Sequence, residues 1–181
     1  VHEGEIAQAL EVIADTPAST VVVVDSFGSL YQEQIRNLVE QYRTALAGTG
    51  KEVGIHAHNN QQLAFANTIE AIIHGANRID ATMGGMGRGA GNCPMELLLG
   101  FLRNPKYRLR PVWQFIQDHL VALQKQMEWG ALPPYVITGQ MNQHLWHPMH
   151  LALVYVGAEV PQVPVIFCLM LPGPTAMPPL S

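Results

Sequence analysis

Apolar residues in the first two thirds of the chain form short continuous runs and longer stripes at helical spacing. Four consecutive valines lead to Asp25, and such a β-branched run is typical of a strand that is buried on both faces. Two further strands are predicted at residues 53–58 and 78–83. Helices are predicted by the stripes at residues 5–14, 31–47, 61–74, 94–103 and 111–127. Strands and helices therefore alternate along this part of the chain.

Alternating strands and helices predict an α/β fold with a parallel sheet. The pattern alone leaves two arrangements open, an open doubly wound sheet and a barrel. A complete (β/α)8 barrel takes roughly 250 residues, whereas this chain has 181 residues and three clear strands. We therefore expect any barrel formed by this chain to be a partial one.

The composition changes near residue 144. All ten Lys and Arg residues lie at or before Lys125, whereas nine of the thirteen prolines lie at or after Pro133. Beyond residue 144 the only Asp, Glu, Lys or Arg is Glu159, and prolines recur too often for a helix. We predict three parts: residues 1–110 as α/β repeats, 111–144 as a helix and loop, and 145–181 as an irregular Pro-rich tail. The tail is hypothesised to be out of frame, which the source DNA can test.

Charge and cysteine content narrow the classes of partner and compartment. The formal net charge is −4 and no dense basic run is present, so nucleic acid is not an expected partner. Glu159, Pro161 and Pro164 interrupt the apolar stretch 151–171, so no membrane span is expected. The start of the chain shows no signal peptide and looks truncated, and its two cysteines form no framework; we expect a cytoplasmic protein.

The strongest candidate for chemistry is the pair His56 and His58. Side chains two positions apart on a strand point to the same face, so both imidazoles can approach one metal ion. The pair also lies at the carboxyl end of its predicted strand, where α/β enzymes place their sites. Two histidines at a strand end can equally be hydrogen-bonded surface residues, and two imidazoles leave a coordination sphere incomplete. The metal hypothesis therefore requires further ligands.

A glycine-rich loop follows the third predicted strand. Residues 84–92 contain five glycines, which let a backbone approach a ligand closely. Their spacing differs from the dinucleotide-binding fingerprint, which makes a nucleotide site a poor interpretation. Arg88 could bind a carboxylate, and the Asn92 oxygen could bind a cation or cap the next helix. The alternative is a flexible turn with a capping Asn.

Three further residues are candidates with plainer alternatives. Asp25 and Asp80 lie at the ends of apolar strands, where an unpartnered carboxylate would be costly. Each could belong to a site beside the histidines, although a structural hydrogen bond to a neighbouring strand end or loop is favoured. Cys93 is interpreted as a small buried residue in preference to a nucleophile.

Three motifs in order resemble one enzyme superfamily. They are V-V-V-V-D-S-F-G, G-I-H-A-H-N-N-Q-Q-L-A-F-A-N and I-D-A-T-M-G-G-M-G-R-G-A-G-N-C-P-M-E. Their succession at strand–helix spacing resembles the pyruvate-carboxyltransferase (HMG-CoA lyase-like) metallolyases, and most closely the 4-hydroxy-2-oxovalerate aldolase branch. The resemblance covers residues 5–110. It implies a partial TIM barrel, with this chain supplying roughly strands five to seven and their helices.

The resemblance also implies roles for several residues. His56 and His58 correspond to ligands of a divalent ion, Mn²⁺ or Mg²⁺, and Asn92 to a residue in or near the coordination sphere. Asn59 and Arg88 become candidates for substrate binding, and Tyr135 is a candidate for the active-site tyrosine of a late loop. The first-strand Asp ligand, Arg and His of the superfamily are not among these 181 residues.

The implied activity is cleavage of a 4-hydroxy-2-oxo acid to pyruvate and an aldehyde through a metal-stabilised enolate. An HMG-CoA lyase-like or 2-isopropylmalate synthase-like enzyme is the alternative within the superfamily. Because essential residues are missing, we expect the chain alone to be inactive, as a truncated fragment would be. The implied partners are a small 2-oxo acid and, for the intact protein, an acylating aldehyde dehydrogenase.

Overall fold

We describe the fold from a computed structural model, in which residues 3–104 and 106–142 are placed. The predicted tail at residues 145–181 lies outside the described residues, and the predicted domain boundaries stay a prediction. The main elements are α1 Glu3–Ala14, β1 Thr20–Asp25, α2 Gln32–Ala45, β2 Glu52–Ala57, α3 Ala64–Ile73, β3 Arg78–Ile79, α4 Met95–Leu102, α5 Leu109–Phe115, α6 Val121–Gln124 and α7 Pro133–Gln140.

The three strands form a parallel sheet in the order β1-β2-β3, which confirms the predicted α/β class. β1 pairs with β2 along its whole length, from Thr20 opposite Glu52 to Asp25 opposite Ala57. β3 is much shorter and contributes only two paired residues, Arg78 and Ile79. All three strands run in the same direction, so the loops that follow them meet at one edge of the sheet.

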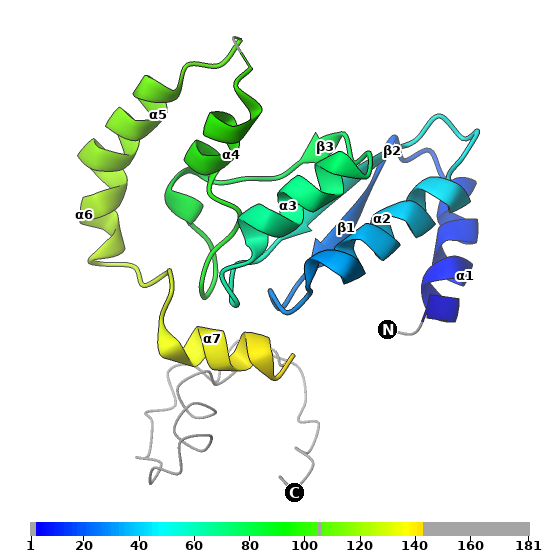
Figure 1. The fold of residues 1–181 in the computed structure, drawn as a ribbon, viewed down its shortest axis with the longest axis horizontal. Helices are drawn as coiled ribbons and strands as arrows, with labels where there is room; N and C mark the ends of the chain where they lie inside the picture. The colour runs from blue at the N-terminus through cyan, green and yellow to red at the C-terminus, as the bar shows by residue number, and fades with distance from the viewer. Residues whose placement is uncertain (1–2, 105, 143–181) are drawn as a thin grey trace, which may run out of the picture.

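Helices α2 and α3 cover one face of this sheet, in front of the strands in Figure 1. Their apolar stripes meet the inward side chains of β1 and β2 in the main core. Buried members include Ile35 and Val39 of α2, Ala71 of α3, Val23 of β1 and Ile55 of β2. Each fully buried Val or Ile side chain contributes roughly 1.5–3 kcal/mol by leaving water. Packing in this layer fixes the positions of β1 and β2, and the candidate site lies at the carboxyl end of β2.

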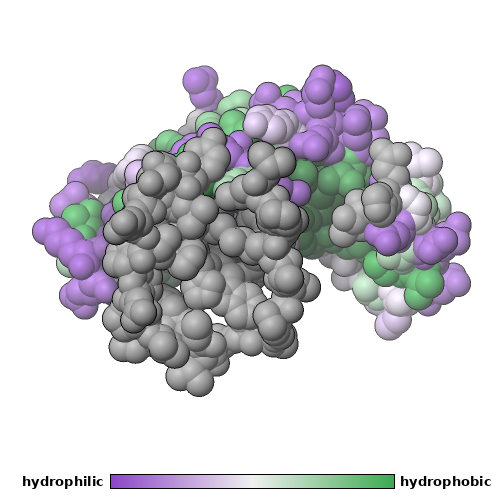
Figure 2. All heavy atoms as spheres, turned by 90° about the horizontal axis from the view of Figure 1, so that it is seen from below, coloured by the Kyte–Doolittle hydropathy of each residue, from purple (hydrophilic) through white to green (hydrophobic). Residues whose placement is uncertain are grey.

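The opposite face of the sheet is open in the described part of the chain. Alternation along β1 and β2 places Val22 and Val24 on that face, together with His56. The Val24 residue is 50% exposed. A view from the α7 side shows apolar surface gathered in a recess beside a hydrophilic rim (Figure 2).

The structure differs from the predicted elements in four places. The third strand ends at Ile79, short of the predicted end at Met83, because the chain then turns to pair Thr82 with Pro94. Helix α3 begins at Ala64, three residues late, because Gln62 has a positive φ of 61°. The helix predicted at 111–127 is three segments, α5, a π-helical turn Ile116–Leu120 and α6. Helix α7 was not predicted.

The later helices extend away from the sheet and then return to it. α4 to α6 lie to one side, whereas α7 lies beyond the carboxyl ends of the strands (Figure 1). Among the described residues, none of the helices is both long and apolar enough to cross a bilayer. The stretch 151–171, considered above as a membrane span, lies outside the described residues.

Candidate functional site

The two histidines lie side by side at the carboxyl end of β2. His56 is in the strand, and His58 follows it directly after Ala57. Their ring centroids are 5.1 Å apart, with an angle of 72° between the ring planes. The same-face placement predicted from their spacing is therefore present.

Asp80 contacts the first of these histidines. Its Oδ2 lies 3.0 Å from Nδ1 of His56. The carboxylate comes directly after β3, so the bond joins neighbouring strand ends and also lies beside the histidine pair. The structure therefore agrees with both interpretations of Asp80, as a hydrogen-bond partner of a neighbouring strand end and as a carboxylate beside the histidine pair.

His58 differs from His56 in the surroundings of its Nδ1. Its Nδ1 is buried and has no hydrogen-bond partner within the described structure. Burial lowers the pKa of His58 to about 4, and the positive charge of Arg88 and the protonated form of His56 are smaller causes in the same direction. The ring is therefore neutral at neutral pH, which is the form that can donate a lone pair to a metal ion.

The glycine-rich loop brings Asn92 to the histidines. Asn92 forms an antiparallel bridge with His58, and the N–H of Asn59 donates to the Gly91 carbonyl at 2.9 Å. The Asn92 side chain donates from Nδ2 to the Met86 carbonyl at 3.2 Å. Its Oδ1 is buried without a partner among the described groups. An orphan amide oxygen and an orphan imidazole nitrogen thus occur on paired residues.

Glycine at position 91 is required by this close packing. Gly91 has a φ of +85°, and a Cβ built on it would lie only 1.9 Å from the Gly85 carbonyl oxygen. The Asn92 N–H also donates to the Gly85 carbonyl, at 3.0 Å. The loop therefore folds back on itself in a compact turn, which fixes the backbone position of Asn92.

The two candidate substrate-binding residues differ in how far their side chains are already engaged in polar contacts. Arg88 is exposed, and within the described ranges no carboxylate oxygen forms a salt bridge with it. Asn59 is engaged locally: its Oδ1 accepts the N–H of Ala64 at 3.1 Å, and its Nδ2 donates to Oε1 of Gln62 at 3.4 Å. Arg88 is thus free to meet an anion, whereas Asn59 also fixes the start of α3.

Tyr135 is directed toward a carboxylate and lies on the unpredicted helix α7. Its hydroxyl donates to Oε1 of Glu128 at 2.6 Å. Burial and the Glu128 carboxylate raise the pKa of Tyr135 to about 12, so the phenol is protonated at neutral pH. No described contact joins Tyr135 to the histidines, and its proposed role stays a prediction.

The plainer interpretations of Asp25 and Cys93 are confirmed. The Asp25 carboxylate is buried and accepts the backbone N–H groups of Ser29 and Leu30, at 3.0 and 3.2 Å. Burial raises its pKa, and these hydrogen bonds partly oppose that rise. Cys93 is fully buried in the core, and burial raises the pKa of its thiol.

The residues at this edge fit a divalent cation in part. Two imidazoles and an amide oxygen form a mixed donor set of the kind that binds divalent cations, and the orphan atoms of His58 and Asn92 lack another partner in the described structure. No group of three or more His, Cys, Asp or Glu suited to a metal occurs within residues 3–104 and 106–142. The described chain thus supplies part of a coordination sphere.

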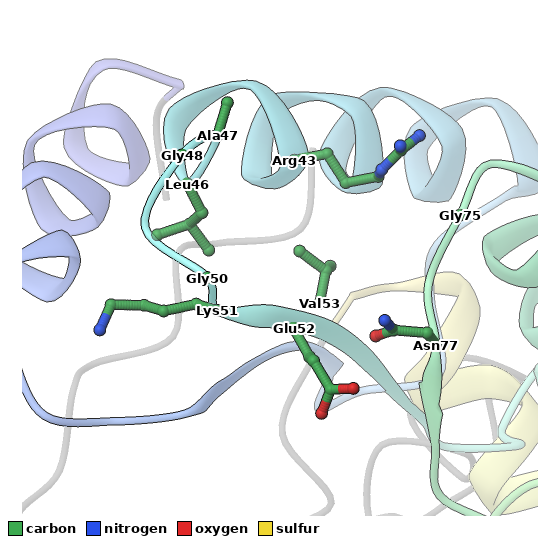
Figure 3. A pocket seen from close by; sticks show the side chains of 10 residues that line it. All are labelled: Arg43, Leu46, Ala47, Gly48, Gly50, Lys51, Glu52, Val53, Gly75 and Asn77. Atoms are coloured by element: carbon green, nitrogen blue, oxygen red, sulfur yellow. The ribbon is translucent and has the colours of Figure 1, made fainter.

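A hollow of about 390 Å³ lies at the opposite, amino end of β2 (Figure 3). Arg43 and Lys51 line it, but their side chains extend to opposite sides. Arg43 donates to the His74 carbonyl at 3.0 Å, and Lys51 to the Ala18 carbonyl at 2.9 Å. These cations stabilise the backbone, and the hollow is remote from the histidine end of the strand.

Sequence patterns missed two contacts that support the site. Thr138 of α7 accepts a hydrogen bond from Asn60, two residues after His58. Trp129 donates from Nε1 to the Gly84 carbonyl at 3.1 Å, at the start of the glycine-rich loop. Neither partner lies near the other in sequence, and only paired variation among homologous sequences could have indicated these contacts.

Relatives match about half of the chain. The chain is 42% identical over 100 residues to 4-hydroxy-2-oxovalerate aldolase 2 of Mycolicibacterium smegmatis, covering 55% of this chain and 28% of that protein. It is 42% identical over 97 residues to 4-hydroxy-2-oxovalerate aldolase 3 of Comamonas testosteroni, covering 54% and 28%. The chain thus matches little more than a quarter of the length of these relatives.

Solved structures agree on the fold. The N-terminal domain of a candidate aldolase from Bacteroides vulgatus matches with a TM-score of 0.74 and 31% identity, over 87% of this chain and 54% of that one. The carboxyl transferase domain of Rhizobium etli pyruvate carboxylase, with pyruvate and biocytin, matches with a TM-score of 0.59 and 19% identity, over 76% and 25%. The described α/β unit is therefore part of a TIM barrel. The HMGL-like family model matches residues 2–127, and the chain belongs to the HMGL-like family.

Proposed function

We propose that the protein containing this chain is a divalent-metal-dependent aldolase that cleaves a 4-hydroxy-2-oxo acid to pyruvate and an aldehyde. The carrying observation is the pairing of His58 with Asn92, which brings two unpartnered buried donor atoms to the histidine end of β2. Relatives named 4-hydroxy-2-oxovalerate aldolase support the choice of reaction.

His56, His58 and Asn92 would hold the cation, preferably Mn²⁺, with Mg²⁺ as the alternative. When bound, the ion would act as a Lewis acid toward the oxygens of a 2-oxo acid. The low pKa of His58 keeps that ring neutral and able to coordinate. Further ligands would come from outside the described residues.

Arg88 would bind the substrate carboxylate. Its guanidinium is exposed on the glycine-rich loop, and its charge contributes to the low pKa of His58, which supports a role at the same site. A guanidinium can bind a carboxylate through two parallel hydrogen bonds, which also fixes the orientation of the acid. Asn59 has one amide N–H left beyond its bond to Gln62, and we retain it as a secondary contact.

The reaction breaks the C3–C4 bond of the substrate. The C4 hydroxyl loses its proton and becomes the aldehyde carbonyl, while the bonding electron pair moves into the 2-oxo group. The resulting pyruvate enolate then takes a proton at C3. The Arg and His that the superfamily resemblance assigns to these charge and proton transfers are not in this chain, so turnover is expected only from a complete protein.

Metal binding by the chain is tested by titration with Mn²⁺, followed by the electron paramagnetic resonance signal of the free ion. Weak binding is expected, lost in His56→Ala and His58→Ala. His119→Ala is the matched control, because it removes an exposed histidine of the π-helical turn. Equal Mn²⁺ affinity in the wild type and both site variants would contradict the assignment.

Activity is tested on the complete gene product with Mn²⁺, by measuring pyruvate release from a 4-hydroxy-2-oxo acid. An acyl-CoA thioester is the competing substrate. Release of pyruvate that is reduced in Arg88→Ala, chiefly through a higher KM, is the expected result. Reaction with the thioester alone would contradict the proposal in favour of the lyase branch.

The aldehyde product suggests the class of partner. Following the superfamily resemblance, we include an acylating aldehyde dehydrogenase as the partner of the complete protein. Such an enzyme would consume the aldehyde that the proposed cleavage releases. Co-purification of aldehyde dehydrogenase activity with the complete gene product tests this part, and its absence from the purified complex would contradict it.

A further inference from the structure

We propose that Asp80 is a positioning residue that fixes the His56 ring, so that Nδ1 carries the proton and Nε2 is left to coordinate the cation. This inference rests on the proposed function, because it concerns the same metal site. The observation behind it is the 3.0 Å contact between Oδ2 of Asp80 and Nδ1 of His56.

Strand register places these two groups together. Ile55 pairs with Ile79 across the β2–β3 ladder, so the next residues, His56 and Asp80, come side by side on the open face. The backbone N–H of Asp80 donates to the Ile55 carbonyl at 3.1 Å, which fixes the main chain from which the carboxylate extends. The contact is therefore built into the sheet and does not depend on a flexible loop.

Hydrogen-bond chemistry then selects one form of the imidazole. An ionised carboxylate only accepts, and a neutral imidazole has a single N–H to donate. Donation from Nδ1 to Asp80 leaves the lone pair on Nε2, the other nitrogen of His56. Metal-ligating histidines commonly use their second ring N–H in this way, and loss of the partner weakens metal affinity by roughly 10–100-fold.

The neighbouring histidine gives an internal contrast. Nδ1 of His58 is buried without a partner in the described structure, whereas Nδ1 of His56 is held by a carboxylate. The two rings lie 5.1 Å apart on the same face, but only one of them has its Nδ1 fixed by a hydrogen-bond partner. Only His56 has its tautomer selected by a neighbouring strand.

The competing interpretation is an ordinary surface ion pair. The Asp80 side chain is 60% exposed and that of His56 30%, and exposed pairs contribute little to stability. An ion pair also requires a charged imidazole with both nitrogens protonated. The positioning role requires a neutral ring protonated at Nδ1. The two interpretations therefore differ in the protonation pattern of His56.

The test uses the full chain with ¹⁵N-labelled histidine, in metal-free buffer at neutral pH. Nitrogen chemical shifts of His56, assigned with a His56→Gln variant, report which nitrogen carries the proton. We expect the Nδ1–H form in the wild type and the Nε2–H form in Asp80→Ala. Asp80→Asn keeps an acceptor oxygen without the charge, and it should retain the Nδ1–H form.

Mn²⁺ affinity is measured on the same proteins, to test whether the tautomer of His56 affects metal binding. Asp80→Ala should weaken binding by about 10–100-fold, with Asp80→Asn losing less. Asp118→Ala makes the same charge change on an exposed residue of the π-helical turn and should leave both readouts unchanged.

The outcomes separate this inference from the proposed function. A wild-type His56 that is doubly protonated or in the Nε2–H form overturns the inference, as does Asp80→Ala binding Mn²⁺ as tightly as the wild type. If the wild type fails to bind Mn²⁺ while His56 is in the Nδ1–H form, the metal assignment fails instead.

Discussion

Asn60 and Thr138 are 78 positions apart in sequence, yet Nδ2 of Asn60 lies 3.4 Å from Oγ1 of Thr138 in a buried contact. Both residues have no exposed surface. A Cβ added to Gly139 would lie 2.8 Å from Cβ of Asn60, so the α7 backbone packs directly against this loop. Helix α7 therefore packs closely against the segment that follows His58.

Thr138→Val should reduce the free energy of unfolding by about 1–3 kcal/mol, because it leaves the buried Asn60 amide without a partner. Thr138→Ser keeps the hydroxyl and should lose much less. Urea unfolding of the full chain measures both. A Thr138→Val variant as stable as the wild type, with a loss only in Thr138→Ser, would show that packing of the Thr methyl group, and not the hydrogen bond, stabilises this contact.

Gly91→Ala should be severely destabilising. The new Cβ would lie 1.9 Å from the Gly85 carbonyl oxygen, and the φ of +85° disfavours any side chain. We expect a loss above about 2 kcal/mol and weaker Mn²⁺ binding, because Asn92 would move. Thermal unfolding and the Mn²⁺ titration provide the readouts.

Gly100→Ala is the matched control for this substitution. Gly100 lies within α4, and its added Cβ would meet only Leu109, at an ordinary 3.8 Å. Alanine in a helix interior should stabilise the chain by roughly 0.5–1 kcal/mol. A Gly91→Ala variant as stable as Gly100→Ala would contradict the compact loop.

Local patterns predicted the parts of the site that depend on one strand. Period-two alternation was enough to place His56 and His58 on one face. The valine run correctly predicted a parallel strand, but the expected burial on both faces was wrong for the described residues, because Val24 is 50% exposed. The contact of His56 with Asp80 depends on the register between β2 and β3, which neither strand encodes by itself. From the sequence alone, Asp80 could therefore be predicted either as a carboxylate of the site or as a partner in a structural hydrogen bond, with no means of deciding between the two.

The late part of the chain was harder to predict for a different reason. Residues 133–140 contain two prolines and a glycine, which obscure a helical pattern. Pro133 and Pro134 occupy the first helical positions, where a missing N–H costs nothing. The helix is then stabilised by tertiary contacts such as that of Thr138, which no local propensity reveals.

Trp129→Phe should reduce stability by about 1 kcal/mol. The substitution keeps most of a buried ring but removes the hydrogen bond from Nε1 to the Gly84 carbonyl. Trp113→Phe, at a residue that is 47% exposed, should be close to neutral. Chemical unfolding of the two variants gives the comparison, and equal effects would argue against a specific role for the Trp129 bond.

Tyr135 should keep its phenolic proton well into the alkaline range. Burial and the Glu128 carboxylate raise its pKa from 10.0 to about 12. The folded chain then holds a proton that the unfolded chain releases above 10.0, so this contribution to stability is present below pH 10.0 and is lost as the pH rises through about 12. Phenolate absorbance, compared between wild type and Tyr135→Phe, isolates this titration. Glu128→Gln should shift it to lower pH, and an unchanged Tyr135 titration in that variant would show that burial alone raises the pKa.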